Sequence, residues 1–114
     1  MTAGGSRQVF IGADHPAFDG HFPGQPLLPG VALLAEVLEA ARAAPALAAC
    51  IGPEPRLAVA KFLAPVRPGA TLSIGFRLGP TALAWTVHEG AQLAASGQFG
   101  RADADADRPA TTAR

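Results

Sequence analysis

One stretch of the chain combines a histidine and two carboxylates in a pattern that suits proton-transfer chemistry. It covers residues 18–41 and reads FDGHFPGQPLLPGVALLAEVLEAA. His21 is the candidate base, because an imidazole gains and loses a proton near neutral pH. Glu36 and Glu39 are candidate acids, since a carboxyl group can give a proton to a leaving group. The pattern therefore predicts that His21 and one of these glutamates form an acid–base pair.

A loop rich in proline and glycine carries His21 and leads directly into a helix. Residues 14–30 contain four prolines and three glycines, which exclude regular structure but restrict the backbone. A long ordered loop of this kind is usually functional. Residues 31–44 are predicted to be a helix, because they contain no glycine or proline and much alanine and leucine. Its surface is apolar apart from three charged residues, so we expect it to lie in a core.

After residue 55 the spacing of apolar residues changes from helical to strand-like. We predict four antiparallel strands, joined as a meander, within residues 56–66, 70–79, 81–90 and 91–100. Residues 9–11 are a candidate first strand. One buried helix against an antiparallel sheet is an α+β architecture.

The length indicates a single domain. A chain of 114 residues is too short for two domains, and 49% hydrophobic residues suffice for a core. Residues 1–6 and 101–114 have little to bury, so we expect them to be disordered. The folded domain is then expected to cover residues 7–100.

The composition excludes several classes of function. Nine basic residues balance nine acidic ones, which argues against nucleic acid as a partner. No stretch reaches the ~18 apolar residues that span a membrane, and no signal-peptide pattern is visible, so a cytoplasmic location is expected. One cysteine and no metal-ligand spacing predict neither disulfide nor metal. Only 16% of the residues are charged, which suggests that part of the surface packs against a second copy.

Two segments resemble the hotdog-fold 3-hydroxyacyl-[acyl-carrier-protein] dehydratases. GHFPGQPLLPGV at residues 20–31 resembles the signature of that family, and KFLAPVRPGATL at residues 61–72 resembles the strand and turn that follow its helix. The resemblance covers roughly residues 9–99 and implies a long helix wrapped by an antiparallel sheet. The short chain is similar to the compact dehydratase-like proteins of aryl-polyene or other specialised lipid pathways.

The resemblance also implies an activity. A 3-hydroxyacyl group on acyl carrier protein would lose water in fatty acid or specialised acyl-chain biosynthesis, without a cofactor. His21 would remove the C2 proton, and the N–H of Gly30 at the helix N-terminus would hold the thioester oxygen. Phe22, Pro29 and Val31 are the other residues that the resemblance places at the substrate. Two copies would pair as a homodimer with two active sites at its interface.

The acid position departs from the family pattern. The family carries Glu or Asp fourteen residues after the histidine, and this chain has Ala35 there. Glu39 is about 40° around the helix from Ala35 and is one candidate to reach back as the acid. A π-bulge that brings Glu36 into place is the second reading. In the third, both are surface charges, with Glu39 paired to Arg42, and the acid is missing.

Two other functions compete with dehydration. A hotdog thioesterase would use a carboxylate and an ordered water at the same helix end. A non-catalytic acyl-thioester-binding subunit would keep the cavity and lack the acid. The HFPG motif favours the dehydratase over the thioesterase, whereas only the helix geometry separates the dehydratase from the binding subunit.

If the chain is a dehydratase, one of Glu36→Gln and Glu39→Gln removes activity and the other does not. The two side chains leave the helix about 60° apart and about 4.5 Å apart along its axis, so both are not expected to reach one hydroxyl. Loss of a general acid lowers the rate by about 10²–10⁴. Turnover of a 3-hydroxyacyl thioester measures this, and equal losses in both variants would contradict it.

Overall fold

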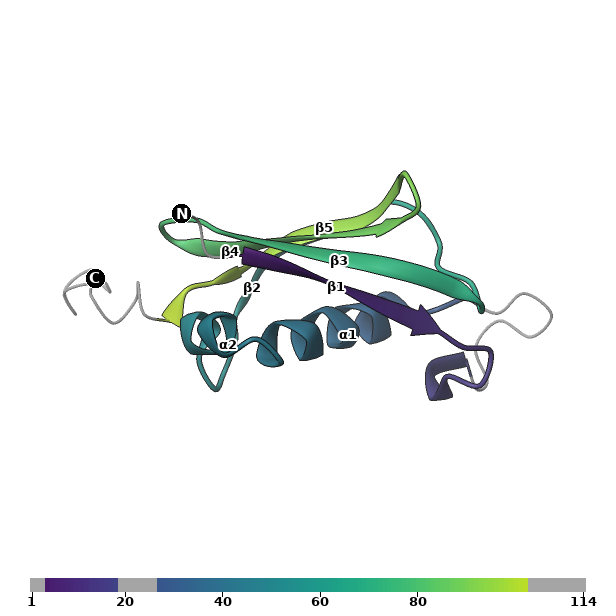
Figure 1. Cartoon of the computed structure of the whole chain (residues 1–114), viewed down its shortest axis with the longest axis horizontal. Helices are drawn as coiled ribbons and strands as arrows, with labels where there is room; N and C mark the ends of the chain where they lie inside the picture. Colours follow the sequence, from purple (N-terminus) through teal and green to yellow (C-terminus); the bar gives the residue numbers. More distant parts are fainter. Residues whose placement is uncertain (1–3, 19–26, 103–114) are drawn as a thin grey trace.

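A computed structural model describes residues 4–18 and 27–102 of the chain. It has five strands and two α-helices, and α1 lies along one face of the sheet (Figure 1). The α+β architecture expected from the sequence is confirmed. The elements in chain order are β1 (Gly4–Ile11), the 3-10 turn η1 (Pro16–Phe18), α1 (Gly30–Arg42), α2 (Pro45–Ile51), β2 (Leu57–Phe62), β3 (Ala70–Leu78), β4 (Ala82–Glu89) and β5 (Gln92–Gly100).

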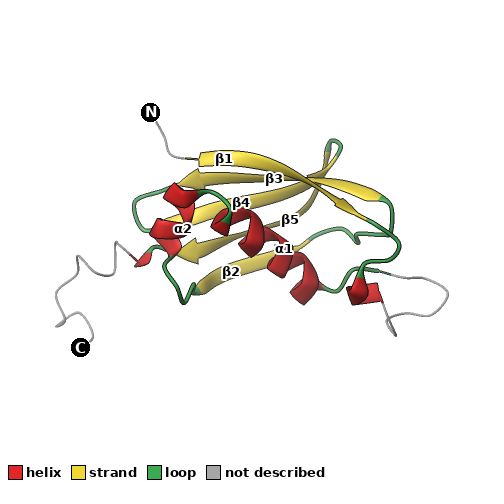
Figure 2. Ribbon diagram, turned by 60° about the horizontal axis from the view of Figure 1, so that its bottom comes forward, coloured by secondary structure: helices red, strands yellow, loops and turns green. Residues whose placement is uncertain are grey.

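The sheet is antiparallel, with the strand order β1-β3-β4-β5-β2 (Figure 2). Only β3, β4 and β5 form a meander, so the predicted four-strand meander is wrong for β2. That strand pairs with β5 at the far edge of the sheet. The connection from β2 to β3 covers residues 63–69 and includes Pro65 and Pro68. It is longer than a usual hairpin loop, and it carries the chain across the sheet to β3 beside β1.

The core lies between this sheet and α1. Leu33, Val37, Ala40 and Ala41 are the buried residues of α1 and share the face toward the sheet. They recur at three- and four-residue intervals, which is the spacing of one helix face. Along β4, residues Leu83, Trp85 and Val87 alternate with less buried ones, as expected for a strand with one covered face.

The first helix ends within two residues of its predicted limit at residue 44, and a second helix follows at Pro45. Pro45 has no N–H to continue the backbone hydrogen bonds of α1, but it suits the first turn of a new helix. α1 accordingly ends at Arg42, and α2 begins at Pro45. Cys50 is buried in α2 as a free thiol.

Both ends of the described fold extend beyond the predicted domain limits. β1 begins at Gly4, and its first residues pair with β3 through the register Gly4↔Arg77 and Gly5↔Phe76. Backbone pairing needs no apolar side chain, so the composition of residues 4–6 did not reveal it. At the other end, the Arg101 N–H donates to the Thr81 carbonyl oxygen at 3.1 Å. The domain therefore includes residues 4–6 and 101–102.

A glycine in β5 makes room for the largest core side chain. Trp85 is only 1% exposed. A Cβ atom added to Gly97 would clash with the indole of Trp85 and with the carbonyl oxygen of Val59 on the neighbouring strand. Trp85 and Gly97 are also directly opposite each other on neighbouring strands. The indole ring of Trp85 therefore occupies the space that a side chain at residue 97 would take. Glycine is required at residue 97 by this close approach.

Gly97→Ala is expected to destabilise the domain, because neither the β2 backbone nor the buried indole can move freely. Overpacking a core typically costs about 1–3 kcal/mol, and in a domain of this size each kcal/mol lowers Tm by about 4–8 °C. Gly5→Ala is the matched control, since an added Cβ there meets no atom within 4 Å. Thermal unfolding followed by circular dichroism measures both, and an unchanged Tm for Gly97→Ala would contradict the packing argument.

Candidate active site

The described part of the chain includes some of the predicted site residues and not others. His21 and Phe22 lie outside the described residues. Pro29 and Gly30 meet at the N-terminus of α1, and Val31 follows them. Glu36 and Glu39 lie farther along the same helix.

The N-terminus of α1 borders an apolar cavity of about 390 Å³. Its walls come from the chain that leads into α1, from the first turns of the helix, and from the end of β2 with the segment that follows. The lining residues are Leu27, Leu28, Pro29, Gly30, Leu33, Phe62, Leu63, Ala64, Pro65 and Val66. None of these side chains is charged, so the cavity suits an apolar chain.

The helix end beside this cavity is free to accept an anionic group. The first intrahelical bond at this end runs from the Leu33 N–H to the Pro29 carbonyl oxygen at 3.0 Å, and no side chain within residues 4–18 and 27–102 caps the helix. The N–H groups of Gly30, Val31 and Ala32 therefore have no partner within α1. Together with the helix dipole, they favour negative charge at the cavity wall. A thioester oxygen that gains charge in a reaction is such a group.

Contacts from distant segments fix the position of this helix end. The Leu28 N–H donates to the Val66 carbonyl oxygen at 2.8 Å, which ties the chain before α1 to the segment after β2. The ring of Phe62 lies against Gly30, since a Cβ atom added to Gly30 would be 3.1 Å from the ring. No pattern in the sequence marked Phe62 as a site residue. Only the crossing of β2 to the far edge brings it there.

The two glutamates have different surroundings. Val31, Ala35 and Glu39 are exposed and recur every four residues, so they form one stripe on the side of α1 away from the core. The Glu39 carboxylate makes no hydrogen bond or ion pair with any described residue, and it does not pair with Arg42. Glu36 is half-buried and lies off this stripe. α1 is a regular α-helix over all its residues, so no π-bulge carries Glu36 into the position of Ala35.

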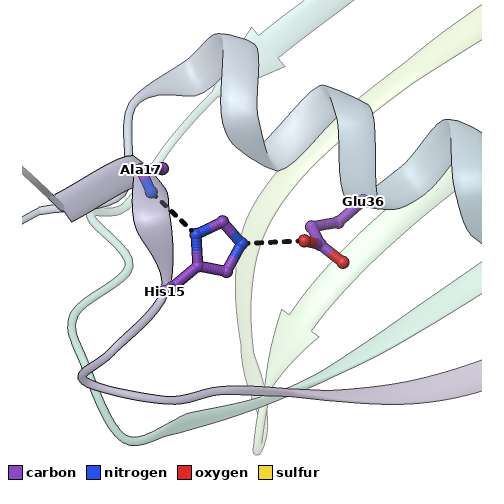
Figure 3. Close-up of polar contacts among 3 residues, drawn as sticks. All are labelled: His15, Ala17 and Glu36. Atoms are coloured by element: carbon purple, nitrogen blue, oxygen red, sulfur yellow. Dashed lines mark hydrogen bonds and ion pairs between the residues drawn. The ribbon is translucent and has the colours of Figure 1, made fainter.

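Glu36 is hydrogen-bonded to His15, a histidine of the segment that precedes the candidate base. The His15 Nε2 atom lies 2.9 Å from a Glu36 carboxylate oxygen, and the Ala17 N–H donates to His15 Nδ1 at 3.1 Å (Figure 3). Both side chains of the pair are 21% exposed. The only signal in the sequence was the position of His15 near the start of the proline-rich loop, residues 14–30. Its partner lies 21 residues farther along the chain.

Neither glutamate reaches the apolar cavity of its own chain. Glu36 and Glu39 are absent from the residues that line it. At a rise of 1.5 Å per residue, they lie about 9 Å and about 13 Å along α1 from Gly30. Both separations exceed the distance between the thioester carbonyl and the 3-hydroxyl of one substrate. Among the described residues that line the cavity, no carboxyl group therefore lies beside the free N–H groups of the helix end.

No described segment qualifies as a membrane-crossing helix, because none is sufficiently long and apolar. Within residues 4–18 and 27–102, no three His, Cys, Asp or Glu side chains gather in a way that would hold a metal ion.

Comparison with known proteins assigns the class of this fold. The ApeI-like family model, described as ApeI dehydratase, matches residues 6–98. The dehydratase heterocomplex ApeI:P from Xenorhabdus doucetiae is 27% identical, with a TM-score of 0.71 and 86% of each chain covered. An uncharacterized protein from Erwinia carotovora subsp. atroseptica is 32% identical, with a TM-score of 0.67 over 86% of this chain and 82% of that one. None of the curated proteins matches the chain.

A third solved structure shows the fold alone. The fluoroacetyl-CoA thioesterase FlK is 17% identical, with a TM-score of 0.59 over 95% of this chain and 96% of that one. The protein is thus a hotdog-fold, dehydratase-like protein, as the resemblance of residues 20–31 and 61–72 implied. The chain belongs to the ApeI-like dehydratase family.

Proposed function

We propose that the chain removes water from a 3-hydroxyacyl thioester and so forms the trans-2-enoyl thioester. The observation that carries the proposal is the uncapped N-terminus of α1 beside an apolar cavity, in a member of a dehydratase family. The cavity suits the acyl chain, and the free N–H groups suit the thioester oxygen.

The reaction divides into a base, an oxyanion donor and an acid. His21 takes the C2 proton, and the electrons of that C–H bond form the C2–C3 double bond. The N–H of Gly30 stabilises the charge that develops on the thioester oxygen. The C3–O bond breaks, and the hydroxyl leaves as water with a proton from the acid. Phe22, Pro29 and Val31 are proposed to contact the substrate beside these groups.

We assign the acid to Glu39 of a second chain rather than to Glu36. Glu39 is exposed on the Val31–Ala35 stripe and is free of described partners, whereas Glu36 is held by His15. The separation of about 13 Å from Gly30 along α1 excludes Glu39 of the same chain. A partner that packs against the exposed stripe is therefore part of the proposed site.

The surface of the chain offers a place for that partner. β2 is an edge strand, and Leu57, Val59 and Phe62 are exposed along it, followed by Leu63. Val31 on α1 is 82% exposed. An edge with unpaired backbone groups and apolar side chains pairs readily with another strand. We propose that two copies pair through β2 as a homodimer, with α1 of one copy facing the site of the other.

A carrier-bound substrate and a cytoplasmic role complete the proposal. The acyl group is presented on acyl carrier protein, in fatty acid or specialised acyl-chain biosynthesis. Support comes from the family match.

A second candidate is a binding subunit that works with a different hotdog chain. The specific observation in its favour is Ala35 in the acid position. The similar ApeI:P dehydratase is a heterocomplex, which makes a non-identical partner a reasonable source of the acid. In that case the β2 edge and the α1 stripe bind the partner in place of a second copy.

The activity is tested with purified chain and a 3-hydroxyacyl group on acyl carrier protein, with the products followed by mass spectrometry. Loss of water from the acyl group is the expected result, and His21→Ala should remove it. Glu89→Ala is the control, since Glu89 is exposed at the end of β4. Release of the free acid would instead establish a thioesterase. Binding without turnover would favour the binding subunit.

The pairing is tested by analytical ultracentrifugation of the wild type and of Val59→Lys. The wild type should sediment as a dimer at micromolar concentration, and the added charge on the apolar β2 edge should shift it toward the monomer. Gln8→Lys is the matched control, because Gln8 is exposed on the opposite edge strand. A folded wild-type monomer would contradict the homodimer.

A further inference from the structure

We propose that His15 and Glu36 form a positioning pair. The pair holds residues 15–18, the segment just before the residues that include the candidate base His21, and it takes no part in proton transfer. The inference rests on the proposed function. It also removes Glu36 from the candidates for the missing acid, because its carboxylate is already engaged within its own chain.

The hydrogen bonds assign the tautomer of His15. The Ala17 N–H donates to Nδ1, so Nδ1 must present its lone pair. The neutral ring then carries its hydrogen on Nε2, which donates it to the Glu36 carboxylate at 2.9 Å. One ring thus links two segments through both nitrogens (Figure 3). A doubly protonated ring would turn the bond to Ala17 into a contact between two donors.

The backbone of His15 is fixed as well as its ring. Its N–H donates to the Gly12 carbonyl oxygen at 3.1 Å, and its own carbonyl oxygen accepts from the Phe18 N–H at 3.0 Å. The His15 ring also meets the ring of Phe18 edge-on, with centroids 6.1 Å apart. Phe18 is buried in the core. His15 therefore organises the whole turn η1 and ties it to the second turn of α1.

This turn is the last described structure before residues 19–26, which include His21. The first residues after that segment are fixed too, because the Leu28 N–H bonds to the Val66 carbonyl oxygen. The His15–Glu36 pair and the Leu28–Val66 bond thus hold the described residues on both sides of residues 19–26. Misplacing a catalytic group by about 1 Å can cost about 10² in rate, so small shifts at these two ends matter.

The surroundings of Glu36 favour positioning over acid catalysis. The small cavity between β1 and α1, about 130 Å³, is lined by Arg7, Gln8, Val9, Glu36, Glu39 and Ala40. It is separate from the apolar cavity at Gly30, whose lining includes neither glutamate. Among the described residues, His15 is the one that binds the Glu36 side chain.

Four variants separate the two roles. Glu36→Gln keeps an oxygen that accepts from His15 Nε2 but cannot act as an acid, whereas Glu36→Ala removes the bond. His15→Asn keeps an oxygen near Nδ1 for the Ala17 N–H and loses the bond to Glu36. His15→Gln keeps an N–H near Nε2 and loses the bond to Ala17. His88→Asn is the control, because His88 lies on β4 and takes no part in the proposed site.

The rate of turnover of a 3-hydroxyacyl-carrier substrate should depend on whether the hydrogen bond between residues 15 and 36 is kept. It should not depend on whether residue 36 has a carboxyl group. We expect kcat to fall about 10- to 100-fold in Glu36→Ala and His15→Asn, with KM nearly unchanged. Glu36→Gln should restore kcat to near that of the wild type. The double variant His15→Asn/Glu36→Ala should be no worse than either single one, since both remove the same bond.

Other outcomes overturn the proposal. If Glu36→Gln is as inactive as Glu36→Ala, then Glu36 is the proton donor. If Glu36→Ala behaves like His88→Asn, the pair positions nothing. A readout independent of turnover comes from nitrogen NMR of the imidazole in the full chain. An unprotonated Nδ1 that changes in Glu36→Ala supports the pair even if the wild type shows no dehydration, and a protonated Nδ1 contradicts it.

Discussion

The position of β2 at the far edge of the sheet is the constraint from which the candidate site follows. Because β2 pairs with β5 and not with β3, its last residue, Phe62, meets Gly30 at the start of α1. The segment after β2 then closes one wall of the apolar cavity and holds Leu28 through the Val66 carbonyl oxygen. A simple meander would have left the helix end without this wall. The long connection with its two prolines is therefore as much a part of the site as the helix.

Much of the fold was predictable from the sequence, because it depends on local patterns. The alternation within residues 70–100 predicted β3, β4 and β5, and the run of helix-forming residues 31–44 predicted α1. The pairing of β2 was not predictable in this way, since strand partners are chosen by contacts between distant residues. The start of β1 at Gly4 was missed for a related reason. Backbone hydrogen bonds hold those glycines, and composition does not record them.

The candidate site was predictable in part. The position of Gly30 at a helix end followed from Pro29 and the helical pattern after it, and the structure places both residues beside a cavity. The role of Phe62 depends on topology alone. Glu36 and Glu39 were equivalent candidates in the sequence. Helical spacing gives the direction in which each side chain leaves the helix, but not the residue that it contacts. A hydrogen bond from His15, distant in sequence, distinguishes them, and periodicity carries no information about such a contact.

The exposed apolar edge at β2 affects how easily a newly synthesised chain aggregates. A chain whose β2 edge is unpaired exposes backbone groups beside Leu57, Val59 and Phe62. Such an edge can pair with a strand of any other chain. Pairing of two chains is bimolecular, so each chain stays unpaired for longer when the concentration of the chain is low. Proper assembly and aggregation then compete for the same edge. With the proposed pairing, the solubility of the chain in the cell would depend on its concentration, and production together with the proposed partner would protect it.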